Sequence, residues 1–238
     1  MRSYLVSQGI NDIVSDMSFP VKDRMSKWGV PDDKLFERLK ADLKDDRIGT
    51  PMLRIIQTSS SHEPFDVPYN RLADERLNAF AFTDECIGDF ITSLKASPQW
   101  NNSLVILLPD HQGCWPVGIS NEALGHYHIP MIWTGGALAK GGEVDTIGSQ
   151  QDLAATLLGQ LNISHDDMLF SKDMLSPTVP HFAFFTVNDL FGMITEDNSL
   201  IFDNKSKRPV LDNGLATGAN IEPGKAYLQK LYDVIDEL

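Results

Sequence analysis

An aspartate and a histidine, Asp110 and His111, follow directly after an apolar run at residues 104–108 and Pro109. An unbroken apolar run rich in branched side chains predicts a strand that is buried on both faces. Ligands of open α/β sheets bind just beyond the carboxyl ends of such strands. A carboxylate oxygen beside an imidazole nitrogen suits a transition metal such as Mn²⁺ or Zn²⁺. The pattern therefore indicates half of a metal site, although a turn-capping aspartate beside a surface histidine would give the same sequence.

The elements around this pair read as alternating strands and helices. Residues 52–56 form a second apolar run, and they lead into the polar stretch QTSSSHEPF at residues 57–65. Residues 71–96 have helical periodicity, so residues 52–108 predict a βαβ unit with a crossover helix. A third strand is expected at residues 129–134, where it follows the sequence GHYH. These elements predict the α/β class, with an α/β/α sandwich around a mainly parallel, mixed sheet.

The last quarter of the chain has a different pattern. Short alternating apolar runs surround Asp197 and Asn198, which predicts antiparallel strands, and a helix closes the chain. Ser149 and Asp152 have the types and order of a capping box at the start of another helix. We therefore expect two parts: residues 1–177, and a small antiparallel extension with a terminal helix at residues 178–238.

Composition excludes some partners. The chain has 238 residues, a hydrophobic fraction of 42% and a net charge of −13. Binding to nucleic acid requires a basic face, so no nucleic-acid partner is expected. Two cysteines, Cys86 and Cys114, are too few for a disulfide framework, and spacing does not decide whether they pair. No apolar run approaches the roughly 20 residues of a membrane span, and no signal peptide is expected.

Five motifs in this order resemble the sulfatase branch of the alkaline phosphatase superfamily, with the lipoteichoic-acid-synthase-like phosphoglycerol transferases as the nearest group. They are WGVPD at residues 28–32, TSSSHEPF at 58–65, DHQG at 110–113, HIP at 128–130 and SQQDLAATL at 149–157. The resemblance covers residues 4–175 in order and continues more loosely to the end of the chain. It implies that residues 1–177 are the C-terminal portion of a catalytic domain.

The resemblance also implies a site. Enzymes of this kind use a threonine nucleophile and a metal that is bound in part by an Asp-His pair, which Asp110 and His111 match. The implied cofactor is a divalent metal, with Mn²⁺ preferred over Zn²⁺ or Mg²⁺. His62 matches a histidine that faces the phosphoglycerol head group. His128 is a further candidate for substrate binding, although a histidine at the start of a strand often only makes a structural hydrogen bond.

The nucleophile and the first acidic ligand of such enzymes correspond to a region upstream of this sequence. We therefore expect no catalytic nucleophile in this chain, weak metal binding and little turnover. The hydroxyls of residues 58–61 are alternative nucleophiles, disfavoured because the matching family segment positions substrate. Gln112 is a departure, because many relatives have glycine directly after Asp-His. The expected partners are the missing N-terminal half and a phospholipid head group or envelope glycan as substrate, on the outer face of a bacterial membrane.

Three functions fit this resemblance. The first is transfer of phosphoglycerol or phosphoethanolamine to a membrane glycan or lipid. The second is hydrolysis of sulfate or phosphate esters, and the third is a non-catalytic role in binding glycans or lipids. The first is preferred because the motifs match it best, although one fold can host many chemistries.

Overall fold

The computed structural model describes residues 2–24, 29–45, 51–112, 115–120 and 122–237. Three residues named in the motifs above, Trp28, Gly113 and Cys114, lie outside the described residues. The chain divides into two compact units. The first comprises Met1–Gly118 with Ile129–Lys140, and the second comprises Ile119–His128 with Gly141–Leu238. The division between residues 1–177 and 178–238 stays a prediction.

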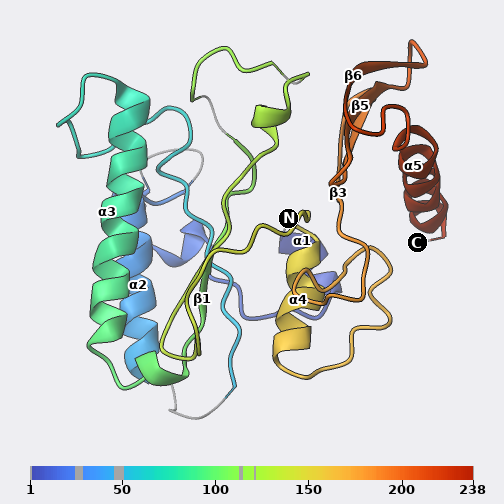
Figure 1. The fold of residues 1–238 in the computed structure, drawn as a ribbon. Helices are drawn as coiled ribbons and strands as arrows, with labels where there is room; N and C mark the ends of the chain where they lie inside the picture. The colour runs from blue at the N-terminus through green and yellow to red at the C-terminus, as the bar shows by residue number, and fades with distance from the viewer. Residues whose placement is uncertain (1, 25–28, 46–50, 113–114, 121, 238) are drawn as a thin grey trace. The chain divides into compact units, whose positions relative to one another are not determined.

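The first unit is built on two long helices that lie side by side (Figure 1). Its elements are α1 (Arg2–Ser7), η1 (Asp16–Ser18), η2 (Val21–Asp23), α2 (Asp32–Asp45), α3 (Glu75–Lys95), η3 (Trp100–Asn102), β1 (Val105–Leu107) and β2 (Ile132–Thr134). Asp74 caps α3 by accepting hydrogen bonds from the backbone N–H groups of Arg76 and Leu77.

The core of this unit lies between α2 and α3. The Phe36 and Phe90 rings are 5.3 Å apart between centroids. Leu39 and Leu94 are buried in the same cluster, and Leu94 lies within residues 71–96, where the sequence predicts a helix. Cys86 is buried there as a free thiol, and this burial raises its pKa to about 12.

The sheet of the first unit differs from the predicted βαβ unit. β1 pairs with β2, and the pairing is antiparallel, with Ile106 opposite Trp133. Residues 52–56 form no helix or strand among the described residues, and Leu53 and Ile55 are 76% and 84% exposed. The prediction of a parallel neighbour for β1 is therefore wrong here. An apolar run favours a strand without ensuring that one forms, and it does not select the strand that it pairs with.

The second unit combines one helix, a four-stranded antiparallel sheet and a terminal helix. Its elements are η4 (Leu124–His126), α4 (Asp152–Gln160), β3 (Ala183–Val187), β4 (Leu190–Ile194), β5 (Asn198–Asp203), β6 (Arg208–Gly214) and α5 (Ile221–Asp236). The strands follow one another in the order β3-β4-β5-β6, which confirms the antiparallel C-terminal pattern. α5 packs closely on this sheet because Gly224 lies where a Cβ would overlap the Phe191 ring.

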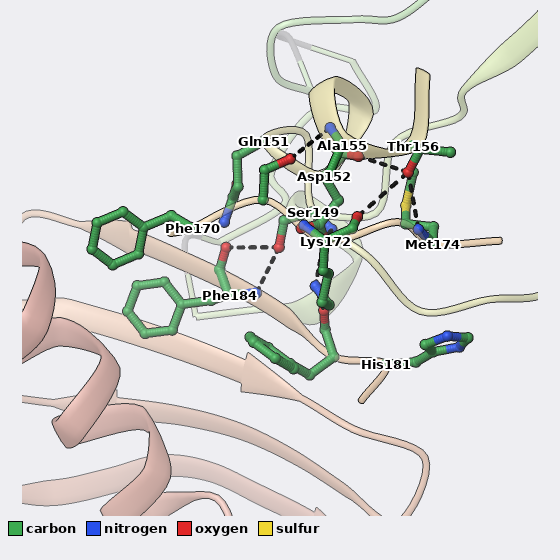
Figure 2. Close-up of polar contacts among 12 residues, drawn as sticks. Ser149, Gln151, Asp152, Ala155, Thr156, Phe170, Lys172, Met174, His181 and Phe184 are labelled. Carbon is green, nitrogen blue, oxygen red and sulfur yellow. Dashed lines mark hydrogen bonds and ion pairs between the residues drawn. The ribbon is translucent and has the colours of Figure 1, made fainter. Parts of the chain in front are cut away.

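The helix α4 begins differently from the predicted capping box. The Asp152 carboxylate accepts from Ser149 N–H at 2.7 Å, which is half of the motif. The Ser149 hydroxyl instead exchanges hydrogen bonds with the backbone N–H and C=O of Phe184 in β3, as Figure 2 shows. The serine therefore fastens the loop before α4 to the sheet of the same unit, and it does not cap the helix.

Candidate metal and substrate site

Asp110 and His111 lie in the loop that follows β1, in the first unit. Asp110 Oδ1 accepts a hydrogen bond from the backbone N–H of His111 at 2.9 Å. His111 Nδ1 lies 2.9 Å from the Gln112 carbonyl oxygen and donates to it. A neutral imidazole that donates from Nδ1 carries its lone pair on Nε2, the usual arrangement in a metal-binding histidine.

The distance between the two side chains fits a shared cation. Asp110 Oδ2 and His111 Nε2 are 3.6 Å apart, and their side chains are 83% and 65% exposed. Two ligands at roughly 2.0–2.2 Å from one ion, at a tetrahedral angle, would be about 3.4 Å apart. The same distance also fits an ion pair between the Asp110 carboxylate and a protonated His111 imidazole. Binding of a metal ion would displace the proton from His111 Nε2. The pair thus fits two corners of a metal shell.

A complete shell requires further donors. Within the part of the chain that the structure describes, no group of three or more His, Cys, Asp or Glu side chains is placed to hold a metal ion. Gln112 Oε1, two residues after Asp110, is buried and has no hydrogen-bond partner among the described residues. The described residues therefore supply two candidate ligands, Asp110 and His111, and weak metal binding stays a prediction.

His62 is exposed on a tight turn in the first unit. Its backbone N–H donates to the Ser59 carbonyl at 3.1 Å, and its own carbonyl accepts from Phe65 N–H at 3.0 Å. Its Nδ1 lies 3.2 Å from the Glu63 carbonyl and donates to it, which orients the ring. A hollow of about 20 Å³ borders the turn, with room for about one water molecule.

The serine hydroxyls beside His62 are engaged in local structure. Ser60 Oγ accepts from the backbone N–H of Asp32 at 2.8 Å. Ser59 Oγ donates to the Val30 carbonyl at 3.2 Å. These bonds engage both hydroxyls in local structure and weigh against Ser59 and Ser60 as substitute nucleophiles.

His128 belongs to the second unit and is exposed. It follows Tyr127, whose ring stacks on Phe185 of β3 with centroids 3.6 Å apart and planes 17° apart. His126 packs edge-on against Tyr127 at 5.0 Å. Burial raises the pKa of the Tyr127 hydroxyl. The aromatic stack thus anchors the loop that carries His128 to the C-terminal sheet of its own unit.

Two buried carboxylates, Asp32 and Asp152, appeared in the sequence motifs but were not predicted as site residues. Asp32 is completely buried at the start of α2. Asp152, 1% exposed, forms an ion pair with Lys172, and Figure 2 shows their side chains meeting beside α4. Lys172 Nζ also donates to the Phe182 carbonyl at 2.8 Å. An acidic residue directly after the proline of WGVPD was the available signal for Asp32, whereas no local pattern in the sequence pointed to Lys172.

Comparison with known proteins confirms the resemblance. The Sulfatase family model matches residues 4–163. Phosphoglycerol transferase I of Xanthomonas campestris is 24% identical over 197 residues, 75% of this chain and 28% of that protein. The lipoteichoic acid synthase-like protein YvgJ of Bacillus subtilis is 25% identical over 191 residues, 66% of this chain and 30% of that protein. The chain thus spans less than a third of each of these relatives.

Solved structures give the same fold. An alkaline phosphatase superfamily protein from Vibrio parahaemolyticus has a TM-score of 0.70 and 23% identity, over 87% of this chain and 56% of that one. The lipoteichoic acid synthase LtaP of Listeria monocytogenes has a TM-score of 0.64 and 17% identity, over 91% and 62% of the two chains. The predicted α/β class is confirmed. No helix among the described residues combines the length and apolar character needed to cross a membrane.

Proposed function

This chain belongs to the sulfatase family, and from that premise we propose that it is part of a metal-dependent phosphoglycerol transferase. The observation that carries the proposal is the Asp110–His111 pair, whose Oδ2 and Nε2 atoms are 3.6 Å apart. The names of two relatives, a phosphoglycerol transferase and a lipoteichoic acid synthase-like protein, favour transfer of a phosphoester group. The proposed substrate is a phospholipid head group or an envelope glycan outside the cytoplasm.

Each residue has a distinct part in this proposal. Asp110 and His111 would hold a divalent cation, preferably Mn²⁺, which polarises a phosphoryl oxygen when it is bound. His62 donates from Nδ1 to the Glu63 carbonyl, so its Nε2 can bear the second proton and donate it toward a phosphate or leaving oxygen. His128 is proposed as a second residue that contacts the substrate. The attacking group is assigned to a part of the protein outside these residues, so this chain alone would turn over little substrate.

Hydrolysis of a sulfate or phosphate ester is the second candidate, because the matching family model is that of the sulfatases. Both reactions would use a divalent metal that polarises an oxygen of a charged ester, a phosphodiester in the first and a sulfate or phosphate ester in the second. The two are separated by the acceptor, which is water in a hydrolase and a glycan or lipid hydroxyl in a transferase. Binding of glycerol phosphate compared with inorganic sulfate distinguishes a phosphate from a sulfate head group, whereas the product formed in the presence of a glycan or lipid acceptor separates transfer from hydrolysis.

The test is a titration of the chain with glycerol phosphate, with and without Mn²⁺, followed by NMR of the histidine rings. We expect binding that requires Mn²⁺ and weakens by about tenfold in His62→Ala, the loss of one charge-assisted hydrogen bond. His165→Ala is a matched control, because His165 Nδ1 also lies 3.2 Å from a backbone carbonyl oxygen, that of Ile163. Equal binding by wild type and His62→Ala, or binding indifferent to Mn²⁺, would refute the assignment.

A further inference from the structure

Asp32 is a buried carboxylate that the proposed chemistry does not use. It is the first residue of α2 and is 0% exposed. Its Oδ1 accepts from the backbone N–H of Ser59 at 2.9 Å and from that of Ser60 at 3.2 Å. These donors are 27 and 28 residues away in sequence, in the turn that carries His62.

The hydrogen-bond partners of Asp32 at the start of α2 differ from those of Asp74 at the start of α3. Asp74, at the start of α3, accepts from Arg76 and Leu77 N–H, which are donors of its own helix. Asp32 Oδ1 accepts instead from a distant loop. A role limited to starting α2 would not require these long-range bonds, so the carboxylate links two segments.

The link runs in both directions. The backbone N–H of Asp32 donates to Ser60 Oγ at 2.8 Å, while Ser60 N–H donates back to Asp32 Oδ1. Ser59 Oγ adds a bond to the Val30 carbonyl at 3.2 Å. Two adjacent residues of the turn are thereby fixed through both backbone and side chain, and a segment held in this way has few alternative conformations.

The second carboxylate oxygen connects the turn to the core. Asp32 Oδ2 accepts from Thr83 Oγ1 at 2.7 Å, and Thr83 is buried in α3. α3 belongs to the cluster that packs against α2. The position of the Ser59–Ser60 turn is thus set by two packed helices through one buried side chain.

The constraint continues from Ser59 to His62. Ser59 donates its N–H to Asp32 and accepts the N–H of His62 with its carbonyl at 3.1 Å. We propose that Asp32 is a positioning residue that fixes where the His62 imidazole meets the phosphoester head group. This inference rests on the proposed function of His62 as a substrate-facing residue.

The test compares Asp32→Ala and Asp32→Asn with Asp33→Ala. Asparagine keeps an Oδ1 acceptor for the two backbone N–H groups, and Thr83 can turn its hydroxyl to accept from the new amide. Asp33 is the adjacent acid on α2, and no bond from it to the Ser59–Ser60 turn is described. Two properties are measured: amide hydrogen exchange at Ser59, Ser60 and His62 relative to α3, and the NMR response of the His62 ring to glycerol phosphate with Mn²⁺.

We expect Asp32→Ala to speed exchange in the turn by about tenfold relative to α3 and to weaken glycerol phosphate binding by about as much. Asp32→Asn should recover most of both properties, and Asp33→Ala should match wild type. If Asp32→Ala does not fold, Ser60→Ala replaces it, because this change removes only the hydroxyl that accepts from Asp32 N–H.

The outcomes separate this inference from the function on which it rests. Unchanged relative exchange in the turn and unchanged His62 ring signals in Asp32→Ala would overturn the positioning role, even if wild type binds glycerol phosphate. Faster exchange in the turn with no binding by wild type would support the positioning of His62 while refuting the proposed function. A uniform rise in exchange in α3 and the turn alike would also overturn the inference, since it would assign Asp32 to general stability.

Discussion

Asp152, in the second unit, and Asp110, in the first, are carboxylates that differ in burial and in their hydrogen-bond partners. Asp152 is 1% exposed and accepts from Ser149 N–H at 2.7 Å, from Lys172 N–H at 3.1 Å and from the Lys172 ammonium. The Asp110 side chain is 83% exposed, and its Oδ1 accepts from the neighbouring His111 N–H. The difference teaches that a buried carboxylate such as Asp152 is committed to hydrogen bonds of the fold, whereas the Asp110 side chain is open to solvent and can be reached by a cation.

Burial determines how much the removal of each carboxylate, Asp152 or Asp110, lowers the free energy of unfolding. Lys172 Nζ bonds to Asp152, donates to the Phe182 carbonyl and lies 4.0 Å from the centroid of the Phe182 ring. A buried pair of this kind can contribute little net stability, because both charges lose hydration. Removal of one partner leaves the other as an uncompensated buried charge. The Asp110–His111 pair carries no such penalty because water reaches both side chains.

The largest effect is expected at Asp152. Asp152→Ala should lower the free energy of unfolding by about 3 kcal/mol, because it leaves the Lys172 ammonium, whose side chain is 15% exposed, without its carboxylate. Urea denaturation followed by circular dichroism measures this change. The double variant Asp152→Ala/Lys172→Met should recover part of the loss, since it removes the stranded charge. A loss below about 1 kcal/mol in the single variant would place Asp152 with the exposed carboxylates.

Asp74 should give a smaller, pH-dependent effect. Its carboxylate accepts hydrogen bonds from residues of its own helix, α3. The hydrogen bond from the Arg76 side chain, together with those from the N–H groups of Arg76 and Leu77, lowers the pKa of Asp74 from 3.8 to about 2. Because the pKa of Asp74 is lower in the folded than in the unfolded protein, its ionised carboxylate stabilises the fold above pH 4. This stabilisation is lost as the pH falls toward 2 and the carboxylate becomes protonated. The melting temperatures of wild type and Asp74→Ala should therefore converge between pH 4 and pH 2. A difference that stays constant over this range would show that the carboxylate charge is not involved.

Local periodicity predicted much of the fold. The spacing of Phe90 and Leu94 on one face identified α3, and the alternation around Asp197 and Asn198 identified the antiparallel C-terminal strands. The pairing of β1 was predicted wrongly as parallel, because an apolar run carries no information about its partner. The hydroxyl of Ser149 was assigned to a helix cap, but it bonds to Phe184, 35 residues away.

The candidate site was predicted where its residues are adjacent in sequence. Asp110 and His111 could be recognised as a pair because two successive residues after a strand necessarily lie close together. Asp32 could not be linked to the turn of His62 in this way, because Ser59, which donates to it, is 27 residues away in the sequence. Its other partner, Thr83, is 51 residues away, and that contact depends on how α2 packs on α3. Side chains that act over such separations become visible only in the folded chain.

The most direct test of the account is Mn²⁺ titration of the wild-type chain, Asp110→Ala and His111→Ala, followed by calorimetry and by paramagnetic broadening of histidine ring signals. Asp84→Ala, an exposed acid on α3, is the matched control. We expect weak Mn²⁺ binding that broadens the His111 signals, is lost in Asp110→Ala and His111→Ala, and persists in Asp84→Ala. None of the three single variants should change the free energy of unfolding by more than about 0.5 kcal/mol. Binding that survives Asp110→Ala unchanged, or His111 signals that do not respond to Mn²⁺ in wild type, would contradict the assignment of this pair as metal ligands.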